Sequence, residues 1–407
     1  MDWDDTPEQA AFRAEVRQFI GTELPAYYRS IEKRRAAATR PEGNDWMTDL
    51  LLGDDEARAA AADWNNALLA RGWAQPGWPR EYGGGGLSTM EQFILKQELT
   101  RAEAPEVGST GGGGQIGPTL LVHGTEEQKR TYLPGTLSGQ YLWAQGYSEP
   151  GAGSDLASLQ TRAVRDGDEW VINGQKMWTS NAHKANWVFL LVRTDPQAPK
   201  HRGISFLMAD IKSPGITIRP IVSMGGWHVT NEVFYENVRV PADQIVGEEN
   251  RGWYVGMTLL DYERSAISGA MQQQKSLREL LDEVHGQRTP HRAGLTRAEI
   301  ADRHIEIEVN TNLNIRIATM QARGMVPNYE ASMVKAFSSE LSQRLARTGV
   351  KTFGLYGLLF DADEPLAPVR AKHVLAMVGS VVGTIAGGSN EIQRNIIATR
   401  GLGLPRG

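Results

Sequence analysis

The sequence of 407 residues contains no cysteine. Disulfide bonds, thiolate nucleophiles, zinc sites with cysteine ligands and cysteine-bound iron–sulfur clusters are therefore excluded. It also has no run near the roughly 18 apolar residues that a membrane span requires, so we expect no membrane insertion. The net charge of −5 argues against nucleic acid as the main partner, because phosphate backbones are bound by basic surfaces.

Several signals for targeting and catalysis are missing as well. The N-terminal segment MDWDDTPEQ is acidic and lacks the apolar core of a secretion signal, which predicts a cytoplasmic location. The eight histidines do not cluster and no HExxH motif occurs, so we predict no metal site. A GxSxG motif, which marks a nucleophilic serine on a strand-to-helix turn, does not occur either.

A chain of this length exceeds the usual size of one hydrophobic core, which predicts two or three domains. Residues 1–140 have helical patterns, with a start signal at Thr6-Pro7 and a capping box from Thr125 to Gln128. The glycine runs at 83–86 and 111–114 are not followed by Lys-Ser or Lys-Thr. We therefore predict plain loops there and no phosphate cradle.

Residues 141–248 change to short runs of branched and aromatic residues, separated by turn signals such as Asn173-Gly174. No helix-length segment lies between these runs, which excludes a parallel βαβ sheet and predicts an antiparallel barrel or sandwich. The Gly-Ala-Gly sequence at 151–153 is not a dinucleotide fingerprint, because Leu156 holds the third glycine position and no helix follows.

Residues 249–407 are helical again, and long helices with short links predict a four-helix bundle. The predicted fold class is therefore α+β, with an N-terminal all-α domain (1–140), a middle β-domain (141–248) and a C-terminal bundle (249–407). The expected helices of the bundle span 252–283, 296–323, 328–351, 367–382 and 391–399.

Three stretches contain residues that suit chemistry. The stretch 142–180 brings hydroxyls, backbone N–H groups and the aromatic face of Trp178 together, which suits a planar ligand such as a flavin. The stretch 260–264, Leu-Asp-Tyr-Glu-Arg, has three charges among apolar neighbours; its alternative interpretation is a solvated helix face. The stretch 385–394 has two glycines before Ser389 and Glu391, which suits polar oxygen at a helix start or is an ordinary N-cap.

Four motifs resemble those of the acyl-CoA dehydrogenase family, in the family's order across nearly the whole chain. They are YSEPGAGSD, NGQKMWTS, EVFYENVRVP with VGEENRGW, and GGSNEIQR. The resemblance implies the same α–β–α order of domains. It also implies FAD in a crevice between the β-domain and the bundle, in a tetramer where a neighbouring subunit helps to hold the cofactor.

The resemblance also assigns roles to individual residues. Tyr147 and Ser148 would face the pyrimidine edge of the flavin. Trp178 would pack on the ring, with Thr179 and Ser180 bonded near N5. The remaining assignments are Ser154 at the acyl-CoA, Asp261 and Arg264 along the thioester and pantetheine path, and Ser389 and Glu391 at the nucleotide part of FAD.

One departure from the family pattern concerns the catalytic base. Many members place the glutamate just before the glycine of the C-terminal motif, where this chain has Gly387. Isovaleryl- and long-chain-type members place it instead on the first bundle helix, where this chain has Glu263. The resemblance therefore implies Glu263 as the base that removes the α-proton. The backbone N–H of Gly387 and a ribityl hydroxyl of FAD would hold the thioester oxygen.

The implied reaction is α,β-dehydrogenation of an acyl-CoA to a trans-2-enoyl-CoA, with the β-hydride passing to flavin N5 and the electrons to an electron-transfer flavoprotein. The small side-chain volume at Gly387 predicts a branched or bulky acyl group. The sequence most resembles bacterial members that include subunits of α2β2 steroid- and dicarboxylate-degrading dehydrogenases. The family's cross-subunit FAD grip is altered at 353–357, and its arginine is not identifiable at 287–291.

Two other functions remain open at this point. The same fold can serve a flavin oxidase or monooxygenase that uses O2. A non-catalytic partner subunit of a heterotetrameric dehydrogenase is the second alternative. Retention of both Glu263 and the flavin-facing residues 178–180 argues against the partner-subunit interpretation.

Overall fold

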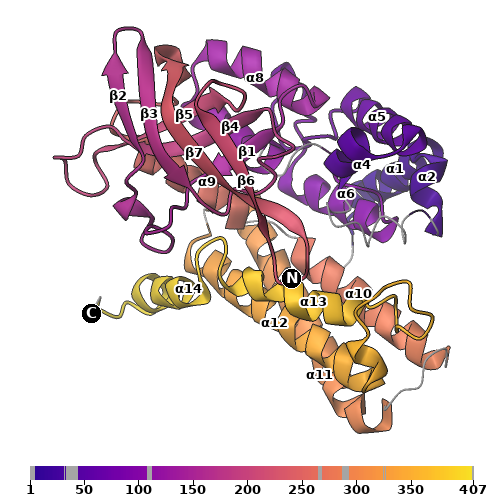
Figure 1. Cartoon of the computed structure of the whole chain (residues 1–407). Helices are drawn as coiled ribbons and strands as arrows, with labels where there is room; N and C mark the ends of the chain where they lie inside the picture. Colours follow the sequence, from indigo (N-terminus) through magenta and orange to yellow (C-terminus); the bar gives the residue numbers. More distant parts are fainter. Residues whose placement is uncertain are drawn as a thin grey trace. The chain divides into compact units, whose positions relative to one another are not determined.

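The computed structural model describes residues 5–31, 33, 45–107, 112–264, 268–286, 293–323, 325 and 327–405, without the side chains of 260–264, 268 and 293–295. Two compact units make up the chain. The sheet unit contains Ala11–Ser88 and Ala102–Glu263, and the helical unit contains Met1–Ala10, Thr89–Arg101 and Arg264–Gly407. Along the sequence, helices are followed by strands and then by helices again (Figure 1), as predicted.

The first helices begin at the capping signals of the sequence. The Thr6 hydroxyl accepts from Gln9 N at 3.3 Å, and the Gln9 side chain accepts from Thr6 N at 3.0 Å. Thr125 and Gln128 form the predicted capping box. The helices before the sheet are α1 (Pro7–Glu23), α2 (Ala26–Arg29), α4 (Trp46–Leu52), α5 (Asp55–Ala70), α6 (Thr89–Arg101), α7 (Gly117–His123) and α8 (Glu126–Ser138).

The two glycine runs differ in structure. The run at 83–86 lies in a loop, as predicted, and a Cβ on Gly84 would lie 2.2 Å from the carbonyl oxygen of Trp78. For the second run the loop prediction was wrong, because Gly112–Ile116 forms a π-helical turn that continues into α7. Side chains crowd this backbone so closely that a Cβ on Gly113 would lie 1.8 Å from Gln75 Nε2.

Seven strands form one sheet in the order β1-β4-β2-β3-β7-β6, with β5 paired to β4. Most pairings are antiparallel, as predicted. Strand β4 is an exception, because β1 and β2 both pair with it in parallel, with Trp143 opposite Trp187 and Arg162 opposite Arg193. The strands are β1 (Trp143–Gly146), β2 (Arg162–Asp166), β3 (Glu169–Lys176), β4 (Trp187–Arg193), β5 (Ile204–Asp210), β6 (Ile216–Val222) and β7 (His228–Pro241).

The predicted turn at Asn173-Gly174 is a bulge within β3. The strand continues to Lys176, and its register with β7 shifts between Ile172 and Gly174. A Cβ at residue 174 would lie 2.5 Å from Thr161 Oγ1. Glycine is needed here because the backbone and side chain of Thr161, just before β2, approach closely. After the bulge, β3 continues to Lys176 and leads into the segment that carries Trp178.

The helix α9 (Gly252–Arg264) begins against the sheet. A Cβ on Gly252 would lie 2.3 Å from the backbone nitrogen of Phe206, and Val255 and Leu259 are buried. His123 Nε2 lies 2.9 Å from Thr258 Oγ1, which ties α7 to α9. The sequence predicted one helix over 252–283. The structure describes α9 up to Arg264 and α10 from Ser268, and residues 265–267 lie outside the described residues.

The helical unit has an apolar core and a buried polar layer. Leu280, Ile307 and Leu341 are fully buried in the core. Buried Gln273 donates to Ser342 Oγ at 2.8 Å and accepts from Asn310 at the same distance, so three helices share one satisfied network. Its helices after the sheet are α10 (Ser268–His285), α11 (Ala293–Ala322), α12 (Tyr329–Phe353), α13 (Lys372–Gly379) and α14 (Asn390–Ile396).

Candidate active site

The loop after β1 is closed upon itself. Glu149 and Ala152 exchange backbone hydrogen bonds of 3.0 Å, which folds the Pro-Gly turn of YSEPGAGSD into a tight bridge. The carbonyl of Ser148 accepts from Met177 N at 2.8 Å, so the loop is joined to the end of β3. Tyr147 is buried and Ser148 is half-buried. The two predicted flavin-edge residues therefore lie next to the segment that carries Trp178.

A buried ion pair joins this loop to the end of β3. Lys176 Nζ lies 2.7 Å from Glu149 Oε1 and donates to the carbonyl of Tyr147 at 3.1 Å. The other partners of Glu149 are the backbone N–H groups of Gln160 at 2.6 Å and Thr161 at 3.0 Å. Burial opposes the charge of Glu149, but Lys176 and these donors outweigh it and hold its pKa below the ordinary value.

In the turn at 178–180 the indole of Trp178 is exposed to solvent and the hydroxyl of Thr179 is buried. Trp178 has φ +60° and its side chain is 57% exposed, which is costly for a large residue without a ligand. Thr179 is fully buried, and Ser180 is exposed. Asn231 fastens the turn, because the backbone of Thr179 donates to and accepts from the backbone of Asn231 at 3.0 and 3.1 Å.

The chemistry of this turn fits a flavin. Thr179 Oγ1 is buried and has no hydrogen-bond partner among the described residues. An orphaned buried hydroxyl costs free energy unless another group completes its hydrogen bond. Beside it, the exposed indole of Trp178 offers a flat apolar face. A planar ring with a polar edge would satisfy both groups at once, so these residues can hold the isoalloxazine that the sequence predicts.

The predicted acyl-CoA residue Ser154 is exposed in the same loop. The next residue, Asp155, accepts from the Ser158 hydroxyl at 2.6 Å and pairs with Lys200 at 2.5 Å. These contacts hold the pKa of Asp155 below its usual value, mainly through Lys200. Ser154 is therefore carried on a fixed loop, and its contact with substrate stays a prediction.

The predicted base lies on the last turn of α9. The backbone of Asp261, Glu263 and Arg264 is helical, but their side chains are outside the described structure. The start of the same helix packs on the sheet, where a Cβ on Gly256 would lie 3.2 Å from the hydroxyl of Tyr147. The helix α9 thus contacts buried Tyr147 near its start and carries Glu263 near its end. The roles of the three charged residues remain predictions.

The C-terminal motif forms a turn through two glycines on left-handed backbone. Gly387 and Gly388 have φ +63° and +83°, values that favour glycine. Their carbonyls both accept from Gln393 Nε2 at 3.1 Å, and Gly388 also accepts from Lys335 Nζ at 2.7 Å. Because both carbonyls are bonded on one side, the orientation of the peptide groups in this turn is fixed.

The turn leads into α14 through an ordinary N-cap. Ser389 Oγ accepts from Ile392 N, which is the alternative that the sequence left open for this residue. Glu391 is exposed, and its own backbone N–H and the Ser389 hydroxyl lower its pKa. An N-cap does not exclude contact with a nucleotide, so the predicted roles of both residues stay open.

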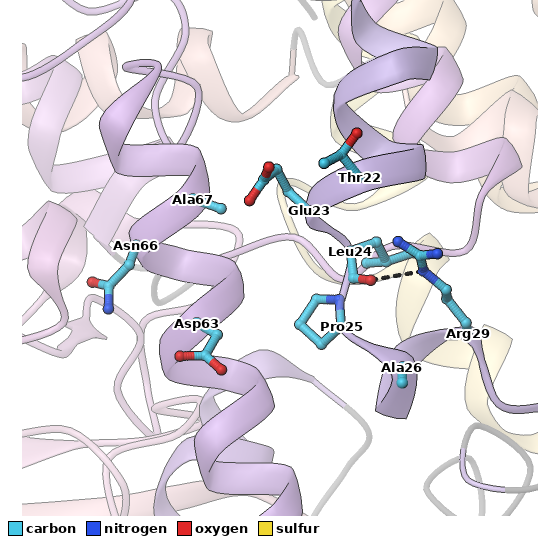
Figure 2. Close-up of a pocket in the computed structure, with 9 residues that line it drawn as sticks. All are labelled: Thr22, Glu23, Leu24, Pro25, Ala26, Arg29, Asp63, Asn66 and Ala67. Carbon is cyan, nitrogen blue, oxygen red and sulfur yellow. Dashed lines mark hydrogen bonds between the residues drawn. The ribbon is translucent and has the colours of Figure 1, made fainter.

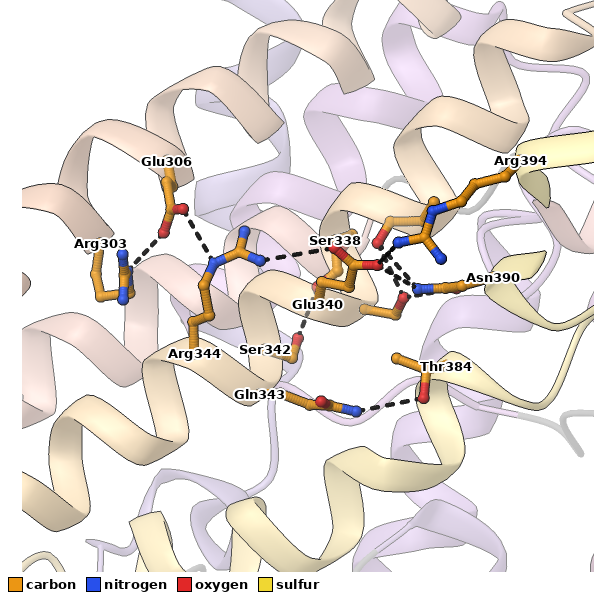
Figure 3. Close-up of polar contacts among 12 residues, drawn as sticks. Arg303, Glu306, Ser338, Glu340, Ser342, Gln343, Arg344, Thr384, Asn390 and Arg394 are labelled. Atoms are coloured by element: carbon orange, nitrogen blue, oxygen red, sulfur yellow. Dashed lines mark hydrogen bonds and ion pairs between the residues drawn. The ribbon is translucent and has the colours of Figure 1, made fainter. Parts of the chain in front are cut away.

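A network of alternating charges anchors α14 to α12 (Figure 3). Asn390 donates to Glu340 at 3.1 Å, and Arg394 pairs with the same carboxylate. Glu340 is also 3.8 Å from Arg344, which contacts Glu306 of α11 at 3.0 Å. The position of the glycine turn thus depends on residues of two other helices.

The segment at 353–357 lacks the groups that would grip a nucleotide. Phe353 ends α12 and is buried, whereas the Leu355 side chain is 81% exposed. Lys351, one turn earlier, pairs with Glu299 at 2.9 Å. The predicted arginine region at 287–291 lies outside the described residues. Among the described part of this segment, no side-chain amide is presented.

A cavity among the described residues lies apart from these loops. It has a volume of about 760 Å³ and is formed by α1, α2 and α5 (Figure 2). Its Arg29 is already occupied, since the guanidinium donates to the carbonyls of Leu24 and Gly21 at 2.7 Å each. No group of three or more His, Asp or Glu side chains suited to a metal ion occurs among the described residues. None of the described helices is long and apolar enough to cross a bilayer.

Comparison with known proteins identifies the family. The chain matches the acyl-CoA dehydrogenase N-terminal domain over residues 52–140, the middle domain over 144–238 and the C-terminal domain over 250–402. The chain belongs to the acyl-CoA dehydrogenase family. It is thereby an oxidoreductase of the type that dehydrogenates acyl-CoA thioesters, and members of the family are flavoproteins.

Three similar proteins illustrate the relationship. Acyl-CoA dehydrogenase IpdE1 of Mycobacterium tuberculosis is 38% identical over 90% of this chain and 97% of its own length. The Tcur3481-Tcur3483 steroid acyl-CoA dehydrogenase has a TM-score of 0.83 at 36% identity, with 100% of both chains covered. The ChsE4-ChsE5 complex from Mycobacterium tuberculosis has a TM-score of 0.81 at 34% identity, again with full coverage of both chains.

Several residues that contact the candidate-site segments were missed from the sequence. Lys176 lies inside the motif NGQKMWTS, so the motif itself was a usable signal. Gln393 follows GGSNEI in the same way. The role of Asn231 could not be predicted from its neighbours in sequence. Its partner Thr179 is 52 residues away, and the two meet only in the folded chain. Lys335 likewise reaches the glycine turn from another helix.

Proposed function

We propose that this chain is an FAD-dependent acyl-CoA dehydrogenase that removes the α-proton of its substrate with Glu263. The observation that carries the proposal is the turn at 178–180, which combines an exposed Trp178 on left-handed backbone with a buried Thr179 hydroxyl without a described partner. Left-handed backbone at a large residue and an unbonded buried hydroxyl both cost free energy. A planar ligand that packs on the indole and bonds to the hydroxyl would offset this cost.

FAD would be held by the residues that the motifs indicate. Tyr147, Ser148 and Ser180 would meet the ring edge beside Trp178 and Thr179, and Ser389 and Glu391 would contact the nucleotide. When bound, FAD supplies an acceptor for the hydrogen and the electron pair that leave the β-carbon. The protein's own part is to orient the acyl chain, to exclude water and to manage the α-proton.

The base would act from the end of α9. A carboxylate within hydrogen-bond reach of the α-carbon contributes about 10²–10⁴-fold to proton removal. The position of Glu263 in the sequence matches the isovaleryl-type arrangement, and α9 is rooted in the sheet beside Tyr147. Asp261 and Arg264 would line the path of the thioester and pantetheine, and Ser154 would contact the CoA part.

The thioester oxygen would be stabilised at the glycine turn. The N–H of Gly387 would donate to this oxygen as negative charge develops on it. Removal of one such donor from other enzymes costs about 2.7–4 kcal/mol of transition-state stabilisation. The carbonyls of the turn are bound by Gln393 and Lys335, so little rearrangement would be needed when substrate arrives.

We further propose a bulky or branched acyl group and a second, non-identical chain in a heterotetramer. Gly387 leaves room beside the reacting carbons, and one similar solved protein is described as a steroid acyl-CoA dehydrogenase of two components. The segment 353–357 lacks the usual grip for a neighbour's cofactor, which favours a partner of different sequence. Electrons would leave through an electron-transfer flavoprotein.

Anaerobic titration tests the function directly. The purified protein is expected to be yellow, and bulky acyl-CoAs should bleach the flavin more effectively than short linear ones. Glu263→Gln should retain the yellow colour but lose bleaching, while the exposed matched control Glu249→Gln should behave as wild type. Near-normal reduction of Glu263→Gln would remove Glu263 from the mechanism. A colourless protein unaffected by any acyl-CoA would instead favour a non-catalytic subunit.

A further inference from the structure

The turn at 178–180 is fastened by a single buried side chain. Asn231 is completely buried, and its Nδ2 donates to the carbonyl of Thr179 at 3.0 Å, in addition to the two backbone hydrogen bonds between the same residues. The same amide reaches two imidazoles. Its Nδ2 lies 3.1 Å from His183 Nδ1, and its Oδ1 lies 2.8 Å from His228 Nε2.

These contacts determine which nitrogen atoms of His183 and His228 carry a hydrogen. The two hydrogens of Asn231 Nδ2 go to the Thr179 carbonyl and to His183 Nδ1, so His183 Nδ1 must be an acceptor and its ring neutral. Oδ1 accepts, so His228 Nε2 must donate. Rotation of the amide by 180° would place Oδ1 against the Thr179 carbonyl. The backbone of the turn therefore selects one amide orientation and one tautomer of His183.

The surroundings also oppose a charge on His183. Its ring stacks on His228 with centroids 3.9 Å apart, so both rings cannot easily be charged together. Buried Lys184 follows it in sequence and donates to Thr48 at 2.9 Å, while the carboxylate of Asp45 caps Thr48 and acts in the opposite sense. Burial first, then His228 and Lys184, lower the pKa of His183 to about 4.

We propose that Asn231, His183 and His228 form a positioning unit for the turn at 178–180, and that this unit holds the turn only while His183 is neutral. Protonation of His183 would put two N–H groups against each other and force the amide to rotate. The Thr179 carbonyl would then face an oxygen, and the turn would shift. The inference rests on the proposed function, since Trp178 and Thr179 are taken to contact the flavin.

Asn231→Asp tests the unit in the holoenzyme. The carboxylate has no hydrogen to donate, and its negative charge beside His183 should raise the pKa of that imidazole by roughly 1–3 pH units. The visible spectrum of bound FAD in this variant should therefore change between about pH 5 and 7, whereas the wild-type spectrum should stay constant there. The double variant Asn231→Asp with His183→Gln should lose this transition. A spectrum as constant in Asn231→Asp as in wild type would overturn the inference.

Two milder variants keep the test decisive if Asn231→Asp does not fold. His183→Gln retains an acceptor for Asn231 and should keep wild-type FAD affinity, while His183→Leu removes the acceptor and should weaken FAD binding by about tenfold. Equal affinity of these two variants would contradict the inference. The exposed His304→Gln serves as the control.

Hydrogen exchange at the Thr179 amide separates this inference from the proposed function. The amide is bonded to the backbone carbonyl of residue 231. In Asn231→Asp its protection, corrected for intrinsic rate, should be lower than in wild type at pH 8, where the carboxylate faces the Thr179 carbonyl, and should partly recover at pH 5, where protonated His183 donates to the carboxylate. In wild type the protection should be the same at both pH values. Absence of FAD from the wild type would refute the proposed function. Unchanged protection in Asn231→Asp would refute the positioning unit alone.

Discussion

Lys176 Nζ and Glu149 Oε1 are 2.7 Å apart, and both side chains are buried beneath the loop that carries Tyr147 and Ser148. The ammonium also binds the Tyr147 carbonyl at 3.1 Å. An ion pair in this position connects the end of β3 to the loop after β1. Its loss would therefore disturb both the stability of the sheet unit and the predicted flavin edge.

Lys176→Met should destabilise the protein by about 3–5 kcal/mol, because it leaves the buried charge of Glu149 without its opposite charge. Urea unfolding of the purified protein measures this loss. Lys176→Met combined with Glu149→Gln should recover part of it, since no uncompensated charge remains. The control Lys200→Met breaks an exposed pair with Asp155 and should have little effect. A double variant no more stable than Lys176→Met would contradict the explanation.

His373 should make the protein sensitive to mild acid. Burial lowers its pKa to about 4, so the unfolded chain binds more protons than the folded one between about pH 6.5 and 4. Stability therefore falls as pH decreases through this window, by about 3 kcal/mol in all. His373→Phe should flatten this part of the pH dependence in urea unfolding, and exposed His304→Phe should not. An unchanged slope in His373→Phe would exclude His373 as the source.

Gly252→Ala should loosen α9 from the sheet. The new Cβ would lie 2.3 Å from the backbone of Ser205 and Phe206, which cannot move as a flexible side chain can. We expect a loss of about 1–3 kcal/mol and weaker FAD binding, measured by thermal unfolding and flavin fluorescence. Gly21→Ala, where nothing lies within 4 Å, should instead stabilise α1 by up to about 1 kcal/mol. Equal melting temperatures of the two variants would contradict this account.

Gln393→Leu should slow catalysis while leaving FAD bound. The substitution removes the donor to the carbonyls of Gly387 and Gly388, so the turn would lose its fixed orientation. We expect kcat to fall about tenfold or more, with a smaller change in KM, in steady-state assays with an artificial electron acceptor. Gln343→Leu, which removes an amide bonded to Thr384 (Figure 3), is the control. Wild-type kcat in Gln393→Leu would show that the turn is held by other contacts.

Local patterns predicted the elements but not every break in them. The caps at Thr6 and Thr125 are contacts between residues three apart, so the sequence contains both partners. Gly174 was misread as a turn because its neighbour Thr161, just before β2, is thirteen residues away in the sequence. The run at 112–116 was misread for the same reason, since Gln75 crowds Gly113 from far away in the sequence.

The predicted site shows the same limit. Trp178 and Ser389 belong to motifs that can be recognised in one stretch, and the order of the motifs predicted the family. The groups that hold those motifs in place come from other elements, as Asn231 does for Thr179 and Lys335 does for Gly388. Hydrophobic periodicity carries no information about such partners, because they meet only after the sheet or the bundle has formed.

The hydrogen-bond arrangement of Asn231 also has an evolutionary consequence. Its amide uses both hydrogens and its oxygen on three different partners, so no substitution at this position can replace all of them. A lineage that loses the imidazole at 183 must supply another acceptor or abandon the amide at 231, and a change at 228 removes a donor. Positions 183, 228 and 231 should therefore vary together among related sequences, although nearly fifty residues separate the first from the others.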